Sequence, residues 1–535
     1  MSFIPCKCWQ GENHTHTTPS HYHGISPKTA IQIAQLDSEV HKTTVDQHAI
    51  VKALIEQSTG LSRRRNALLP AVNLPPEILV TIFEFACCPS DEDGRYSTII
   101  TAHFWRSSGS SEEHNLPYRT SVPGPLYISQ VCSVWRNVAI DTSQLWDSIQ
   151  LEVNFKRAKK QAAVLRYWLS KSGQRPLTVG LTEDPAVCVD SYDMPTAVID
   201  VLRPYVHRVE TAELLMTEEW EEALRYIGGC ASLLTTLTLD RLYDSSAADC
   251  VYFFGAPRLR YISLIGYDPH DVELPDNQIE TLSVENFEYE IALLTALVQF
   301  PKLCHYSLNA SAPLNPPLYS LTHNTLQSLE LNFDEVEGVV ANLCRLILPA
   351  LYSFKIRVCI GAPLTVIMLP FFVRTASTLR TLHLGGAQIP EDNLVKVLRV
   401  LPGLLDLSLQ YLKDQDISQH FLSLMNPKEC SRIDQDRPII GAAKSERRRS
   451  LVPDLNTFSC GANVVDSHAL VEFLADRWND ERRGGEAHLA GRLNTSVARL
   501  RTATFTGSRI HLKDEDVVVL HRLRMEGMQV KIGNY

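Results

Sequence analysis

The stretch Leu379-Arg380-Thr381-Leu382-His383-Leu384 carries the pattern that decides the fold: an aliphatic residue, two variable residues, an apolar residue, one variable residue and another apolar residue. This pattern occurs ten times between Leu234 and Phe505, and its last two copies are looser. The copies begin at Leu234, Leu259, Ile279, Leu303, Leu326, Leu351, Leu379, Leu404, Leu455 and Leu500. The first eight copies begin 20 to 28 residues apart. A period of this length indicates a repeat architecture.

The period and the pattern are those of leucine-rich repeats. One such strand cannot bury its apolar face alone, so neighbouring repeats must stack on a continuous core. We therefore expect an α/β fold, an irregular leucine-rich repeat solenoid (horseshoe) over residues 175–535, with a polar insertion at 426–452. A curved array of this kind is a large recognition surface. Binding is therefore the first functional expectation, ahead of catalysis.

Two apolar helices separated by a polar segment precede the array. The first, Leu74–Ala86, opens on two prolines, which pre-set helical φ, and its apolar residues recur at helical spacing. The second, Pro125–Arg136, places a further set of apolar residues on one helical face. A short element at Thr142–Trp146 follows, with a hydroxyl residue suited to a helix N-cap. The sequence thus predicts a small helical domain before the repeats.

These residues resemble the F-box, in the F-box-like form of large fungal (basidiomycete-type) families. The resemblance rests on Leu74–Leu79 (LPPEIL), on Val131-Cys132 with Trp135-Arg136, and on Leu145-Trp146. It implies an F-box-like domain at 70–150 that docks on a Skp-type adaptor, and through it on a cullin and the ubiquitin-conjugating machinery. The residues that the resemblance assigns to this contact are Leu74, Pro75, Pro76, Ile78, Leu79, Ile82, Val131, Cys132 and Trp135.

Two departures from that family pattern and one alternative accompany the resemblance. An inserted loop at 90–124 splits the domain, and Cys87-Cys88-Pro89 stands where the family carries a Leu-Pro pair and an acidic residue. The alternative is that the same apolar residues only fill a local three-helix core and cap the solenoid.

The N-terminal part divides into a tail and a helix. Residues 1–27 are polar and rich in His, Thr and Pro, which predicts a disordered tail, and their Cys and His spacing fits no zinc site. Residues 28–66 are expected to form a helix, in which six of nine a and d positions of a heptad frame from Ile33 to Leu61 are apolar. Two interpretations remain open: a coiled coil that joins two copies through residues 33–61, or one amphipathic helix docked on the next domain.

The variable positions of the repeats are expected to face the concave side of the array. An acidic stretch gives way to a basic one along this row, and Lys355, Arg357 and Arg380 are expected to lie in one patch. The candidate substrate-binding residues are Tyr261, Lys355, Arg357, Arg380, His383 and Tyr411. Such a patch would suit a carboxylate-rich or phosphorylated peptide. In the alternative, the acidic and basic rows pair with each other across the sheet.

Composition sets the outer bounds of the function. A net charge of −10 argues against broad nucleic-acid binding, and thirteen cysteines without paired spacing suggest reduced thiols in the cytoplasm and/or nucleus. No secretory signal is evident, and the longest apolar stretch, 363–373, is too short to cross a bilayer. We find no P-loop, dinucleotide fingerprint, zinc-protease motif or nucleophile elbow, so we expect no enzyme activity, cofactor or metal.

The resulting hypothesis is a substrate receptor of a cullin-type ubiquitin ligase, which holds an unknown protein substrate through its repeats. Such a receptor needs no active site, because it acts by raising the effective concentration of its substrate. The alternative hypotheses are a leucine-rich repeat interaction scaffold, or an F-box protein without a ubiquitin ligase role.

Overall fold

The computed structural model divides into two compact units, which we describe separately. The helical unit comprises the described residues up to Asp141, and the repeat array comprises those from Thr142 onward. The structure describes residues 26–87, 124–153, 157–183, 196–216, 220, 230–241, 251–253, 255–286, 293–310, 320–333, 342–358, 364–386, 389–410, 416–426, 450–461, 463–464, 467–479, 498–506, 510 and 512–533. The tail 1–25, nearly all of the loop 90–124 and most of the insertion 426–452 therefore lie outside the described residues.

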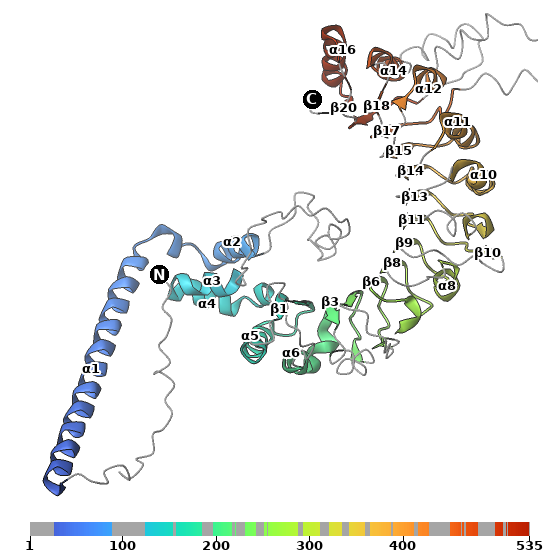
Figure 1. Ribbon diagram of the computed structural model, residues 1–535. Helices are drawn as coiled ribbons and strands as arrows, with labels where there is room; N and C mark the ends of the chain where they lie inside the picture. Colours follow the sequence, from blue (N-terminus) through green and yellow to red (C-terminus); the bar gives the residue numbers. More distant parts are fainter. Residues whose placement is uncertain are drawn as a thin grey trace, which may run out of the picture. The chain divides into compact units, whose positions relative to one another are not determined.

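The helical unit consists of one long helix and a group of short ones (Figure 1). Its elements are α1 (Pro27–Ala67), the 3-10 helix η2 (Pro70–Val72), α2 (Pro76–Cys87), α3 (Gly124–Val131) and α4 (Ser133–Asp141). Helix α2 begins at Pro76, where the missing N–H of proline is no loss, and Glu77 in its first turn suits the positive end of the helix dipole.

The repeat array is built on a parallel sheet of fourteen strands that follow one another in chain order across the sheet. Its strands are β1 (Ser148–Val153), β2 (Leu177–Glu183), β3 (Val209–Met216), β4 (Thr236–Arg241), β6 (Tyr261–Ile265), β8 (Thr281–Asn286), β9 (His305–Ala310), β11 (Ser328–Phe333), β13 (Ser353–Val358), β14 (Thr381–Gly385), β15 (Asp406–Gln410), β17 (Thr457–Cys460), β19 (Thr502–Phe505) and β20 (Gln529–Ile532). Figure 1 shows the sheet lining the inner side of an arc, with the helices on its outer side.

The connections between these strands carry the remaining described elements. The helices are η4 (Ser143–Trp146), α5 (Ala158–Lys171), α6 (Ala197–Leu202), η6 (Arg203–Arg208), η8 (Pro269–Asp271), α8 (Leu293–Gln299), α10 (Leu364–Thr375), α11 (Glu391–Val400), α12 (Gln419–Met425), α14 (Ser467–Asn479) and α16 (Asp514–Met525). Three two-stranded parallel sheets pair β5 (Val251–Tyr252) with β7 (Val272–Glu273), β10 (Leu321–Thr322) with β12 (Leu346–Ile347), and β16 (Asp416–Ile417) with β18 (Asn463–Val464).

The predicted repeat pattern sets the core of the array. In β11, Leu329 and Leu331 point into the apolar core and are buried, while Glu330 between them stays partly exposed. Leu326 is buried just before the strand. The same inward alternation recurs at the second and third apolar positions of all ten copies, because successive side chains of a strand point to opposite faces. The prediction of a leucine-rich repeat solenoid with an α/β architecture is confirmed.

The sheet starts earlier than the expected boundary at 175. Strand β1 pairs in parallel with β2, and its residues Ile149 and Val153 are buried. Trp146, which the F-box resemblance placed in the helical domain, is fully buried in the repeat array, 4.9 Å from the ring of Trp168. The indole pair closes the first end of the core, which explains why the compact unit begins at Thr142.

The other end of the array is tied together by a histidine and a carboxylate. Nδ1 of His468 on α14 lies 2.7 Å from Oδ1 of Asp516 on α16, whose other oxygen accepts the backbone N–H of Lys513. Asp516 is buried, whereas His468 is half-exposed. The hydrogen bond to Asp516, reinforced by its charge, raises the pKa of His468 above the ordinary histidine value. The protonated imidazole thus stabilises the junction of the last two helices.

We predict that Leu329→Ala lowers the free energy of unfolding by about 2–5 kcal/mol, because the residue is fully buried between two neighbouring repeats. Ser328→Ala, one position along the same strand and partly exposed, should change it by less than about 0.5 kcal/mol. Urea unfolding of both variants measures the difference. Equal effects would contradict the assignment of the inward face.

We predict that His468 makes the stability depend on pH. Its folded-state pKa is raised, so its contribution is complete below the ordinary value of about 6.5 and disappears as the pH rises through the folded value. The melting temperature of His468→Gln should therefore fall furthest below that of the unmutated protein in acid and approach it in alkali. His420→Gln, at an exposed position on α12, is the control. A difference in melting temperature between His468→Gln and the unmutated protein that does not change with pH would contradict the role of His468.

Candidate interaction surfaces

Helix α2 carries apolar side chains on two different faces. Leu79 and Phe83 are each 1% exposed and form the inner face, one helical turn apart. Ile78, Ile82 and Phe85 follow the same helical spacing on the other face, and they are 48%, 44% and 78% exposed. A helix of this length needs only one apolar face to pack on its own neighbours. We call Ile78, Ile82 and Phe85 the outer face of α2.

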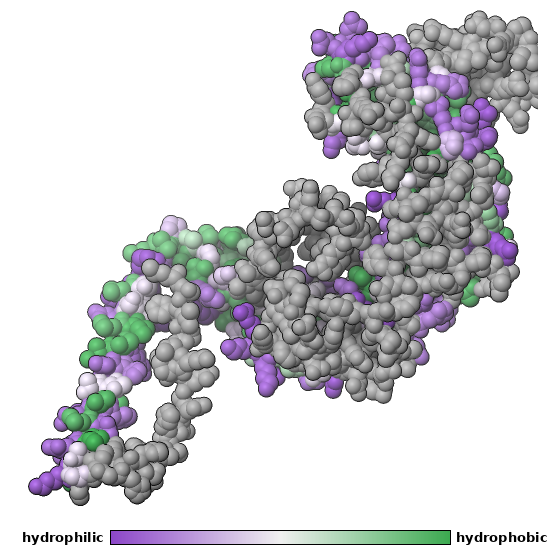
Figure 2. All heavy atoms as spheres, in the orientation of Figure 1, coloured by the Kyte–Doolittle hydropathy of each residue, from purple (hydrophilic) through white to green (hydrophobic). Residues whose placement is uncertain are grey.

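Other apolar residues of the helical unit are also exposed. They include Leu74 and both prolines at the start of α2, together with Val131 at the end of α3. Figure 2 shows hydrophobic residues over the helical unit and along α1. The apolar surface of this unit therefore extends beyond α2.

The predicted Val-Cys-x-x-Trp-Arg motif holds the helical unit together. The helix expected at Pro125–Arg136 breaks at Cys132, whose Sγ accepts the N–H of Trp135 (3.4 Å) and whose carbonyl accepts the N–H of Arg136. Cys132 thus occupies the N-cap position of α4. Trp135 packs edge-on against Phe83, with ring centroids 5.1 Å apart, and its Nε1 donates to the carbonyl oxygen of Ala71. Arg136 donates to the carbonyl of Ser129 and so joins α3 to α4.

The nine residues expected at the adaptor contact therefore fall into two groups. Leu79 is buried, and Cys132 and Trp135 are half-buried with partners inside the helical unit. The exposed ones are Leu74, Pro75, Pro76, Ile78, Ile82 and Val131. Sequence reasoning missed Phe85, although its spacing of three residues from Ile82 and seven from Ile78 would have placed it on the same face.

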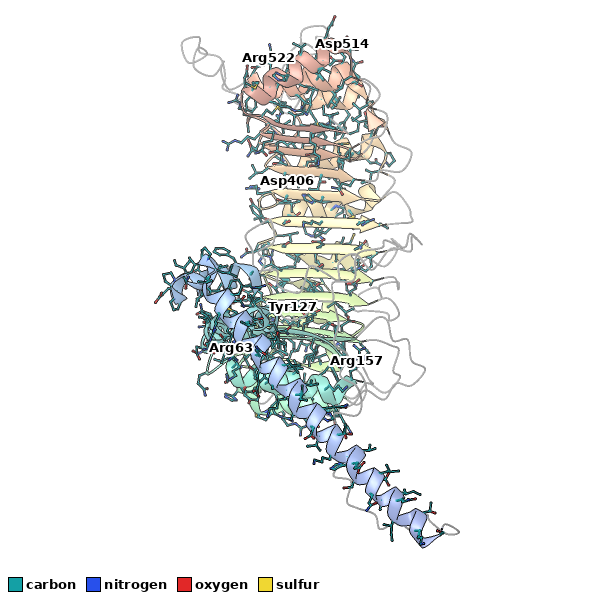
Figure 3. All side chains as sticks on the ribbon, turned by 90° about the vertical axis from the view of Figure 1, so that its left-hand side faces the viewer. Arg63, Tyr127, Arg157, Asp406, Asp514 and Arg522 are labelled. Atoms are coloured by element: carbon teal, nitrogen blue, oxygen red, sulfur yellow. The ribbon has the colours of Figure 1, made fainter. Side chains whose placement is uncertain are left out.

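The concave side of the repeat array, on the face of the strands opposite to the buried leucines, carries a continuous row of residues in register. Each member of the row is the Cα partner of the next on the neighbouring strand, from β4 to β19. The row reads Thr238, Ser263, Ser283, Ser307, Glu330, Lys355, His383, Ser408, Ser459 and Thr504. Thr238 and Ser408 are buried, and the other eight are partly exposed. Three charged or titratable side chains thus stand between two runs of hydroxyls. Figure 3 looks onto these strands, which lie one above another, with Asp406 labelled at the left-hand edge of the sheet. We call the ten residues in register the hydroxyl row.

The charged residues of this face pair with one another. Nζ of Lys355 lies 3.3 Å from Oε2 of Glu330 on the neighbouring strand, and Nε2 of His383 lies 3.5 Å from Oδ2 of Asp406. Arg260 and Glu280 form a further ion pair, each at the position just before its strand, β6 or β8. The geometry therefore matches the alternative in which acidic and basic rows pair across the sheet.

The five described residues among those expected at the substrate contact do not form one patch. Lys355 and His383 are direct register partners, and Arg357 follows two positions along the strand from Lys355. Arg380 lies before β14, where its guanidinium donates to the carbonyls of Leu379 and Ser377.

The two tyrosines of that set also lie apart from the basic residues. Tyr261 is exposed on β6, four strands from β13 and hence about 19 Å away at the usual strand spacing. Tyr411 lies outside the described residues.

Helix α1 presents apolar residues that nothing in the described chain covers. Its large aliphatic side chains, Ile33 excepted, are 53% to 64% exposed. The alternative in which this helix docks on the next domain would bury one of its faces, and no described side chain of α1 is buried.

Two further features bear on the kind of site the chain can offer. No helix in the described part of the chain is both long and apolar enough to cross a membrane. Within the same residues, no three His, Cys, Asp or Glu side chains gather as they would around a metal ion.

Comparisons with known proteins add little to this geometry. No protein-family model matches the chain, and no curated protein matches it. Matching solved structures include an internalin of Listeria monocytogenes, with 13% identity over 58% of this chain and 80% of that chain and a TM-score of 0.30. They also include the Toll–Spatzle complex of Drosophila, with 15% identity over 69% of this chain and 42% of that chain and a TM-score of 0.29. Because these scores are low, the fold assignment rests on the strand register and the repeat pattern.

Proposed function

We propose that this protein is an interaction scaffold whose repeat array binds a protein partner along the hydroxyl row. The observation that carries the proposal is the register of that row across ten strands of one sheet. Serine and threonine side chains are short and both donate and accept hydrogen bonds. A partner's backbone can therefore approach the sheet closely at the partly exposed hydroxyls, which are Ser263, Ser283, Ser307, Ser459 and Thr504.

The charge pattern defines the expected recognition further. Glu330 and Lys355 neutralise each other, as do His383 and Asp406 when the imidazole is protonated. A highly charged partner would have to break these pairs, which favours recognition by shape and neutral hydrogen bonds.

We predict that Ser283→Arg with Ser307→Arg abolishes partner binding, because two long cations would fill the open side of neighbouring strands. Val298→Arg with Val373→Arg, at exposed helix positions on α8 and α10, is the matched control. The measurement is quantitative affinity capture from cells with the full chain, comparing the partners retained by each variant.

Partners lost only with the serine variant would support the hydroxyl row as the binding surface. Partners retained by both variants, or lost equally from both, would contradict it. Thermal unfolding of each variant distinguishes lost binding from lost folding.

A second candidate function is the adaptor-docked substrate receptor of a cullin-type ubiquitin ligase. It is favoured by the outer face of α2, because an amphipathic helix that exposes Ile78, Ile82 and Phe85 suits insertion into the apolar groove of a partner. The resemblance of this segment to the F-box makes a Skp-type adaptor the first partner to test. In this hypothesis the repeat array selects the protein to be modified, and the scaffold activity described above supplies that selection.

We predict that Ile78→Asp with Ile82→Asp abolishes co-purification with a Skp-type adaptor, while Leu79 and Phe83 keep the inner face of α2 packed. Each aspartate would carry a charge into an apolar groove, which is strongly unfavourable. Val298→Asp with Val373→Asp, equally exposed apolar positions in the repeat array, should leave binding unchanged.

Binding by the unmutated protein and the control, with loss only in the α2 variant, would support the receptor hypothesis. A folded unmutated protein that does not bind the adaptor would eliminate it and leave the scaffold proposal standing. Trp135→Ala is unsuitable for this test, because removal of its indole would disrupt the packing against Phe83.

A further inference from the structure

Helix α1 is too long and too exposed to be explained by packing within its own chain. It runs for 41 residues, or about 60 Å at the usual rise per residue. Most helices in proteins owe their stability to tertiary packing of an apolar face. None of the described side chains of α1 is buried, so the described part of the chain does not supply that packing.

The composition of α1 does not replace the missing contacts. Threonine, valine and isoleucine recur in it, and these β-branched residues are only moderate helix formers. Thr43, Thr44 and Thr59 turn their hydroxyls back to the carbonyl four residues earlier. The residues of α1 form no ion pair with one another, as the described side chains show. The helix therefore needs an apolar partner.

Five of the nine exposed large aliphatic residues of α1 lie on one seam with a heptad spacing. Leu36, Val40, Ile50, Leu54 and Leu61 occupy a and d positions, and all five are more than half exposed. A repeat of 3.5 residues matches the geometry of a two-stranded coiled coil, in which such residues fill holes on the facing helix. The seam thus fits another helix of the same periodicity.

The polar positions of the seam favour a second copy of this chain as that helix. Three seam positions are polar: Thr43 and Gln57 fall at d, and Gln47 falls at a. In a parallel, in-register pair each glutamine meets its own counterpart, and two amides can donate to and accept from each other. A partner of different sequence would need matching amides at both positions. One polar residue in a seam is also known to fix register and oligomer state.

The charges beside the seam favour the parallel orientation. In a parallel pair, Glu39 at g faces Thr44 at e of the second copy, and Asp46 at g faces Val51. No like charges meet. In the antiparallel pair that sets Val40 against Ile50, Asp46 faces Asp46 of the second copy, so equal charges oppose each other.

We propose that α1 joins two copies of this chain in a parallel, in-register coiled coil. The dimer carries two repeat arrays and two helical units on one stalk. A partner with two binding sites then meets the second array at a high effective concentration, which strengthens binding without any new contact.

The test is sedimentation of the full chain over a wide range of concentration. The expected mass is twice the 60.1 kDa of one chain. Leu36→Asp with Leu54→Asp should give a monomer, whereas Val45→Asp with Ile55→Asp, of similar exposure but away from the seam, should leave the dimer intact. A monomeric unmutated protein, or two double variants that behave alike, would overturn the proposal. Circular dichroism should show loss of α1 helix only in the seam variant, with the repeat array melting unchanged.

Thr44→Lys tests the orientation separately. In the parallel pair the introduced ammonium faces Glu39 of the second copy, twice per dimer, which should lower the dissociation constant about three- to fivefold at low salt. In the antiparallel pair, position 44 of one copy faces position 44 of the other, so the two introduced ammonium groups would repel and weaken the dimer. Weaker association of this variant would overturn the parallel arrangement. Tighter association of this variant at low salt that disappears at high salt would support the parallel arrangement.

Discussion

The register between neighbouring repeats is the constraint on which the whole array depends, and it is fixed by one backbone arrangement. The carbonyl of the residue before each strand accepts two N–H groups from the next repeat, as Gln327 does from Tyr352 (2.8 Å) and Ser353 (2.9 Å). The same shared carbonyl recurs from Thr235 to Asn456. A slip of one residue would turn every inward leucine to the solvent face, so backbone and apolar core enforce the same register.

Because this constraint acts only at the strands, the connections are free to vary. The polar insertion separates β15 from β17 in sequence, yet the carbonyl of Leu405 still accepts the N–H groups of Asn456 (2.8 Å) and Thr457 (3.0 Å). The register also decides which outward residues meet. Glu330 and Lys355 are 25 positions apart in sequence, and they pair because their strands align. The backbone contacts that align the strands around the core therefore also determine which polar residues meet on the concave side.

The sequence predicted the parts of the fold that depend on periodicity. All ten copies of the pattern lie on strands of one sheet. The first strand escaped prediction, because Ser148–Val153 has no leucine pattern and is recognised only by its pairing with β2.

Side-chain direction at element ends could not be predicted either. Arg380 was expected beside Lys355, but it sits before the strand begins, where alternation does not apply, and its guanidinium turns to nearby carbonyls. Cys132 interrupts an apolar run that reads as one helix, because its thiol and carbonyl cap the next one. Trp135 has a spacing compatible with either a core or a surface position, and only its distance to Phe83 decides between them.

The two units differ in how they leave apolar surface exposed, and this difference indicates different modes of binding. In the repeat array, exposed aliphatic residues such as Val298 and Val373 stand singly on separate helices, as is normal for any protein surface. In the helical unit they recur at helical spacing, on α1 and on the outer face of α2. Random exposure has no period, whereas a helix that packs on another helix or in a groove must present one. On the concave side of the array, Glu330 pairs with Lys355 and His383 lies beside Asp406. The proposed recognition by this side therefore depends on hydroxyls and backbone shape. The helical unit presents exposed apolar faces, and their burial would supply the free-energy gain for the two associations proposed for it.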